Sequence, residues 1–161
     1  MMTDQEIESF WRFIRSSVDR ILLCLNGLSE EDINWRPLDN ANSLYVLATH
    51  TMGNVEENIL GVLCGMEILR QRDDEFKVRG NATEPIQQKW HELQGKISLN
   101  LAMLSPRVLN QEYEHPRRGK ITGRDLLIVI ARHMAEHVGH AELTRDLLFT
   151  TRGRELPARE F

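Results

Sequence analysis

Two histidines one helical turn apart are the residues with the clearest capacity for chemistry. His133 and His137 lie in the segment 121–151 at positions i and i+4. On an α-helix, their imidazoles would project from one face, a spacing that lets both rings bind one metal ion. Leu126 and Ile130 share that face, so a polar seam of hydrogen-bonded core histidines is the alternative. The spacing therefore indicates either a metal site or a seam of core histidines.

A third histidine can complete a metal site. His50 is the only histidine in another predicted helix, residues 43–66, and metal sites in helical bundles are built from inward side chains of facing helices. Three protein ligands with an open position are typical of a catalytic divalent-metal site. Cys64 cannot share an ion with His50 in one straight helix, because roughly 21 Å separates them along the axis. His50 is therefore the natural third partner.

Three further polar residues lie near these histidines. His140 shares the helix face, and we assign it a structural role or the role of hydrogen-bond partner to a ligand. Glu136 and Asn54 are weaker candidates for such a partner or for acid–base catalysis. The stretch from His133 to His137 also matches the H-x-x-E-H signature of inverted zinc proteases, with Glu136 as general base. That alternative needs an acidic ligand far downstream, for which the chain leaves little room.

Four segments with apolar residues at helical spacing must position these side chains. We expect α-helices over residues 4–27, 43–66, 84–104 and 122–150. Their N-caps are predicted at Thr3, at Asn42 or Ser43, at Thr83 and at Thr122. Residues 66–82 and 105–121 form long connections and show no strand pattern. The sequence predicts an all-α fold, a four-helix bundle with long connections that forms one domain over residues 1–161.

The predicted helix over residues 43–66 carries little bulk beside His50. Gly53 and Gly61 lie there, and a glycine within a helix costs about 1 kcal/mol relative to alanine. We expect close contact with another helix, or space for a ligand, to offset this cost. The side of this helix that faces the core is marked by Leu44, Thr51, Val55 and Val62.

The connections hold residues with more than one interpretation. Trp35 is expected to pack as a lid on the end of the bundle, with substrate contact as the alternative. His115 is expected in a loop. Arg117, Arg118 and Lys120 form a basic patch that we interpret as a solvated loop rather than a binding site.

Composition limits the partners. The chain has 161 residues and a formal net charge of −4, which argues against nucleic acid as the main partner. The N-terminus does not resemble a signal peptide, and no apolar run approaches the roughly 20 residues that span a bilayer. Cys24 and Cys64 lie in apolar helical contexts and are expected to be buried, reduced thiols. We expect a soluble, cytoplasmic protein without a membrane partner, and we expect His91 to be exposed.

The ordered motifs resemble the DinB-like superfamily of metal-binding four-helix bundles, which includes YfiT-like proteins and mycothiol-dependent maleylpyruvate isomerase. The resemblance covers most of the chain. It is carried by Asn34-Trp35-Arg36-Pro37 before Ala41-Asn42-Ser43, by His50 in LATH, and by HMAEHVGHAELTRDLL from His133 to Leu148.

The resemblance implies that His50, His133 and His137 are the ligands of one divalent ion, either zinc or nickel. It also implies a homodimer and, from characterised relatives, thiol-dependent transferase or isomerase chemistry. Some relatives have glutamate where this chain has His133, and a neutral imidazole there would leave the ion more positive.

Three functions follow from these observations. The first is a metal-dependent enzyme that acts on a small molecule, in which the ion lowers the pKa of a low-molecular-weight thiol for S-transfer or isomerisation, or of water for hydrolysis. The second is a non-catalytic, metal-binding homodimeric bundle protein. The third is a bundle whose histidines are only hydrogen-bonded core residues.

Overall fold

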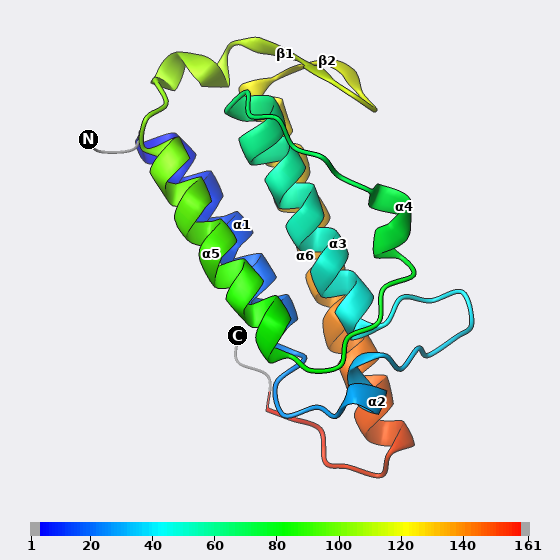
Figure 1. Cartoon of the computed structure of the whole chain (residues 1–161). Coiled ribbons are helices and arrows are strands. Elements are labelled where there is room, and N and C mark those ends of the chain that lie inside the picture. Colours follow the sequence, from blue (N-terminus) through cyan, green and yellow to red (C-terminus); the bar gives the residue numbers. More distant parts are fainter. Residues whose placement is uncertain (1–3, 159–161) are drawn as a thin grey trace.

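The chain folds into a four-helix bundle. The computed structural model describes residues 4–158. The bundle consists of α1 (Gln5–Leu23), α3 (Leu44–Val55), α5 (Glu84–Leu101) and α6 (Gly123–Thr151). Figure 1 shows α1 beside α5 and α3 beside α6, with all four helices running along the long axis of the molecule. The all-α prediction is confirmed, and the helix bounds differ from the expected ones by a few residues.

The N-caps explain where three of these helices begin. Ser43 and Thr122 accept hydrogen bonds from the backbone N–H groups of Val46 and Asp125, as predicted. The first helix is capped by Asp4, which accepts from two backbone N–H groups of the first turn. Thr3, the predicted cap, lies outside the described residues. Each cap satisfies backbone donors that a helix start leaves unpaired.

The helix that carries His50 changes its winding after Val55. Residues Glu56–Leu63 form a π-helix, η1, which the sequence pattern did not predict. A π-helix widens the turn and shifts the phase of every residue after it. Ile59 and Leu63 are therefore buried, whereas Val62, placed in the core by regular α-helical spacing, is only partly buried.

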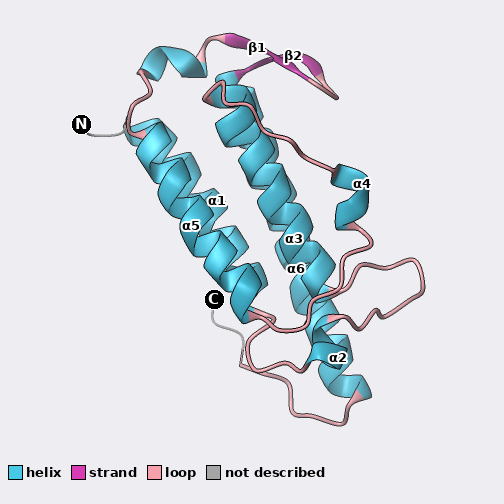
Figure 2. Cartoon of the chain, in the orientation of Figure 1, coloured by secondary structure: helices cyan, strands magenta, loops and turns pink. Residues whose placement is uncertain are grey.

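The connection before α6 contains an antiparallel hairpin, so the expectation that it holds no strand is wrong. Strands β1 (Glu112–His115) and β2 (Gly119–Thr122) pair, with His115 opposite Gly119. Figure 2 shows this hairpin at one end of the bundle, where β1 contacts η1 and β2 contacts α6. Gly119 has φ of 69°, a conformation that favours glycine in a tight hairpin turn. The hairpin contacts both η1 and α6, the elements that continue from or carry the candidate ligands.

Short elements complete the connections. These are α2 (Glu30–Ile33), α4 (Arg72–Glu75) and the 3-10 helix η2 (Pro106–Leu109). Helix α4 lies against the outer side of α3 (Figure 1). The core between the long helices holds the side chains of Ile7, Ile14, Ile21, Met52, Ile59, Ile97, Leu126, Leu127 and Met134. Within residues 4–158, no helix is long and apolar enough to cross a bilayer.

Candidate metal centre

The three predicted histidines meet in space. His50 comes from α3, and His133 and His137 come from the facing stretch of α6. The Nε2 atom of His133 lies 3.3 Å from Nε2 of His50 and 3.2 Å from Nε2 of His137. Among the described residues, these three form the group of side chains able to hold a metal ion. The three rings therefore point toward one another, as predicted.

The nitrogen separations suit a bound ion. Nitrogens about 2.0–2.1 Å from a tetrahedral ion stand roughly 3.3 Å from one another. Hydrogen bonds alone satisfy the cluster less well, because Nε2 of His133 can donate to only one of its two neighbours. Nδ1 of His137 is also buried without a hydrogen-bond partner among the described residues. Three imidazole nitrogens are a donor set suited to zinc or nickel.

The two histidines of α6 are held neutral. Burial, together with the neighbouring His50, lowers the pKa of His133 to about 4. Burial, with the neighbouring His133 and His50, lowers the pKa of His137 to about 3. A neutral imidazole has a free lone pair, which is the form that binds a metal. At neutral pH both rings are therefore ready to act as ligands.

A buried ion-pair network orients His50, and the sequence pattern did not reveal it. Nδ1 of His50 donates to Oε2 of Glu75, the last residue of α4, at 2.9 Å. Arg70 donates to the same carboxylate through Nε at 2.6 Å and Nη2 at 2.8 Å, and to Glu57 at 2.9 Å. With its Nδ1 proton engaged, His50 presents the Nε2 lone pair to the cluster. Glu75 is thus the hydrogen-bond partner of His50, a candidate ligand.

The charges of this network balance. Burial alone would raise the pKa of Glu75, but hydrogen bonds from His50 and Arg70 outweigh burial and lower that pKa. The pKa of Glu57 is lowered in the same way, by Arg117 and Arg70 against burial. Both carboxylates are therefore ionised at neutral pH, so Glu75 can stabilise positive charge on the His50 ring.

The network also explains the glycine beside His50. A Cβ atom on Gly53 would lie 2.2 Å from Oε1 of Glu75 and 3.1 Å from Nε of Arg70. The expected close contact therefore exists, but it is made with the 66–82 connection, which includes the short helix α4, rather than with another long helix of the bundle. Gly53 leaves the space that the Glu75 carboxylate needs to reach His50.

Substituting Gly53 with alanine is expected to weaken metal binding without unfolding the protein. The new methyl group displaces the Glu75 carboxylate, and loss of such a partner costs about 10–100-fold in metal affinity. Alanine favours the helix by about 1 kcal/mol, which offsets part of the clash. Calorimetric zinc titration and thermal unfolding would measure both effects. Unchanged affinity would show that Glu75 does not support His50. The matched control is Gly139→Ala on the open face of α6, where an added Cβ atom meets no other atom within 4 Å.

The histidines lie at the edge of the α6 core stripe, not within it as expected. The buried residues of this helix include Met134, Val138 and Ala141, which lie to one side of the histidine face. His140 and Leu147 are exposed. The His140 ring centroid stands 5.6 Å from that of His137, and no hydrogen bond joins the two rings among the described residues. The edge position gives His133 and His137 access to both the core and the surface.

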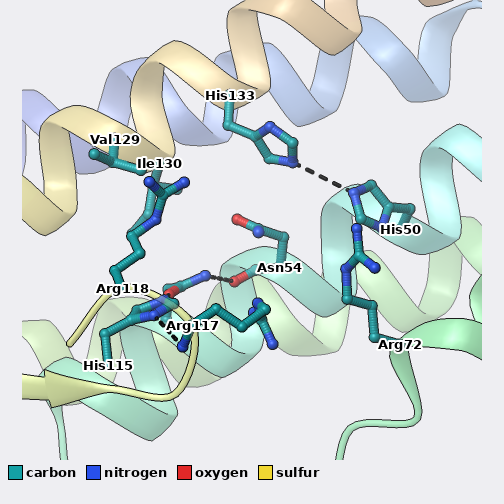
Figure 3. A pocket seen from close by; sticks show the side chains of 10 residues that line it. His50, Asn54, Arg72, His115, Arg117, Arg118, Val129, Ile130 and His133 are labelled. Carbon is teal, nitrogen blue, oxygen red and sulfur yellow. Dashed lines mark hydrogen bonds between the residues drawn. The ribbon is translucent and has the colours of Figure 1, made fainter.

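A polar cavity of about 110 Å³ adjoins two of the three histidines. Figure 3 shows His50 and His133 on one side of it and side chains of the hairpin on the other. Asn54 lines the cavity, and its Oδ1 is buried without a partner among the described residues. Glu136 instead is exposed, with its carboxylate 4.0 Å from Nδ1 of His133.

The hairpin places residues in this cavity that were expected in a solvated loop. His115 is buried at the end of β1, and its ring contacts Oδ1 of Asn58 at 2.8 Å. Arg117 and Arg118, in the turn between the strands, line the cavity as well, and both are exposed, as is Lys120 on β2. The three basic residues are therefore solvated, as expected, although a hairpin rather than an irregular loop carries them. The two strands of the hairpin, of four residues each, are too short to give a recognisable alternation in the sequence.

An apolar groove lies on the other side of the cluster. It measures about 620 Å³ and is lined by Trp35, Pro37 and Leu38 of the first connection and by His140, Leu143 and Leu147 of α6, among others. Trp35 thus sits at the α2 end of the bundle, as the lid interpretation requires.

Both cysteines are free, and neither is a metal ligand or an activated nucleophile. Cys24 is buried and Cys64 is partly buried. Burial raises the pKa of each thiol to about 11. Both are protonated at neutral pH, and the thiolate is the reactive form of cysteine.

The chain is similar to known proteins in sequence profile and in fold. The family model described as mycothiol-S-transferase matches residues 9–149. A crystal structure of a DinB-like protein from Bacillus cereus is similar with a TM-score of 0.70 at 14% identity, covering 99% of each chain. A conserved protein from Enterococcus faecalis has a TM-score of 0.74 at 14% identity, covering 93% of this chain and 99% of that one.

A third structure extends this likeness. A DinB-like protein from Bacillus subtilis has a TM-score of 0.54 at 17% identity, covering 96% of this chain and 97% of that one. At these identities the structures support the fold alone. No curated protein matches the sequence.

Proposed function

The chain belongs to the mycothiol-S-transferase family of DinB-like proteins, and on this premise we propose that it transfers a low-molecular-weight thiol to a small electrophile at the three-histidine cluster. His50, His133 and His137 would hold one divalent ion, zinc or nickel. The observation that carries the proposal is the convergence of three Nε2 atoms, with spacings of 3.2 and 3.3 Å around His133. A bound divalent ion would supply positive charge that lowers the pKa of an incoming thiol.

The residues of the chain prepare the site for this chemistry. Glu75 and Arg70 fix the ring of His50, and burial keeps His133 and His137 neutral. The chain's own thiols are protonated, which supports a nucleophile that comes from solution. In the transfer, a sulfur–carbon bond forms, the leaving group departs with its electron pair, and the thiol proton passes to solvent.

A conjugation assay tests the proposal. Purified protein loaded with zinc or nickel is mixed with mycothiol or another small thiol and with chlorodinitrobenzene, and release of chloride is followed. We expect faster conjugation than with the free ion and thiol alone, and loss of the effect after chelation. A Cys24→Ala/Cys64→Ala double variant should keep the activity, because neither thiol is the nucleophile.

Two other outcomes would redirect the proposal. Release of acid from simple esters or amides without any thiol would favour metal-dependent hydrolysis at the same cluster. Stoichiometric metal binding with no acceleration for any thiol tested would favour the non-catalytic metal-binding bundle. The homodimer implied by the resemblance belongs to the proposal as well, and sedimentation analysis would measure it.

A further inference from the structure

The cavity beside His50 and His133 has an unusual charge. Arg72, Arg117 and Arg118 line it, and no aspartate or glutamate does. This contrasts with the formal net charge of −4 for the chain. A divalent ion on the histidines would add two further positive charges at the cavity wall. Positive charges near a protein surface repel one another by about 4 kcal/mol at 4 Å, and an anionic group placed between them relieves this repulsion. Such a cavity therefore attracts an anionic group.

The carboxylates nearest the cavity are already engaged. Glu75 is held by Arg70 and His50, and Glu57 by Arg70 and Arg117. Neither carboxylate lines the cavity. They therefore balance Arg70 and Arg117 and leave the other arginines of the cavity without a buried counter-charge.

Arg118 is the arginine best placed to bind a ligand. It follows Arg117 in the turn of the hairpin, and Figure 3 shows its side chain reaching from the hairpin toward Ile130 on α6. Within residues 4–158, its guanidinium makes no ion pair. Arg72, by contrast, stacks on Phe76 at 5.1 Å and lies 3.8 Å from the Asp73 carboxylate.

We propose that this cavity binds a carboxylate group of the electrophilic substrate, with Arg118 as the residue that selects it. This inference rests on the proposed transferase function. A guanidinium offers two parallel N–H donors that match the two oxygens of a carboxylate. The volume of about 110 Å³ suits one small planar group of a substrate rather than a whole cofactor. The unpaired Oδ1 of Asn54 offers an acceptor for a neighbouring hydroxyl or amide N–H of the same molecule.

Binding of a matched pair of electrophiles tests this without any turnover. Chlorodinitrobenzoate and chlorodinitrobenzene differ by one carboxylate, and calorimetric titration would measure both on metal-free and zinc-loaded protein. We expect the benzoate to bind roughly tenfold more tightly, the value of one charge-assisted hydrogen bond. Arg118→Gln should remove this preference. Arg15→Gln, the same charge change on the exposed face of α1, should preserve it. Equal binding of the two compounds to the wild type would overturn the proposal.

The same compounds separate this inference from the transferase function. A binding preference for the benzoate that depends on Arg118, with no conjugation of either compound, would keep the anion site and reject the transferase. Conjugation of both compounds, bound with equal affinity, would support the transferase function and reject the anion site. Mercaptopropionate and mercaptoethanol, two thiols that differ by a carboxylate, test whether the site binds the thiol instead of the electrophile. If Arg118→Gln weakens binding of mercaptopropionate but not of the benzoate, the carboxylate belongs to the thiol and the assignment to the electrophile is wrong.

Discussion

The His137→Ala variant is expected to lose both divalent-metal binding and thiol-transfer activity while its bundle remains folded. One of three converging Nε2 donors disappears, and the other two come from different helices. The affinity should fall by more than the ~100-fold that loss of a hydrogen-bond partner causes, because a ligand itself is removed. The fold should persist, because the core stripe of α6 runs through Met134, Val138 and Ala141 rather than through the histidines.

Elemental analysis, calorimetric zinc titration and thermal unfolding of the metal-free proteins would measure these effects. His91→Ala is the matched control, since His91 is exposed on α5 as predicted and lies outside the cluster. Similar unfolding curves for metal-free wild type and His137→Ala would support a site separate from folding. If removing the ion from the wild type unfolds the bundle, and the loaded protein has no activity, the ion is structural, because its binding energy is then folding energy.

The helical period predicted most of the framework that carries the cluster. His133 and His137 were paired by spacing alone, and His50 was the only histidine on the facing helix. Caps at Ser43 and Thr122 also followed from residue type. These features depend on residues close in sequence, and local physics therefore determines them. The position of the histidines at the edge of the core stripe depends on how α6 packs against its neighbours, which the sequence pattern alone does not specify.

The ion-pair network that supports the cluster could not be predicted from the sequence, because it too depends on tertiary packing. Glu75 and Arg70 lie in a charged connection where many side chains could pair, and only the tertiary fold selects which carboxylate reaches His50. A signal existed in Gly53, whose missing side chain indicated a close contact without naming the partner. The hairpin that brings Arg118 to the cavity has strands of four residues each, too short for alternation to be read.

Replacing Arg70 with methionine is expected to cost both stability and metal affinity. The Arg70 side chain is only 5% exposed and joins Glu75 to Glu57. Methionine keeps much of the volume but leaves the Glu75 carboxylate buried without its cationic partner, and breaking a buried pair costs about 3–5 kcal/mol. We expect a loss near the lower end of that range, since His50 still donates to Glu75 and Arg117 still pairs with Glu57. Denaturant unfolding would measure the free energy, and zinc titration the affinity.

Two further variants identify the cause of that loss. Arg20→Met removes an arginine whose pair with Glu142 is exposed, and it should cost no more than about 1 kcal/mol. The Arg70→Met/Glu75→Gln double variant should regain part of the stability, because no unpaired carboxylate is left beside His50. Its metal affinity should stay low, since a neutral amide stabilises positive charge on the imidazole less than a carboxylate does. If Arg70→Met is as stable as Arg20→Met and binds zinc like the wild type, the buried network does not position His50, and the cluster relies on helix packing alone.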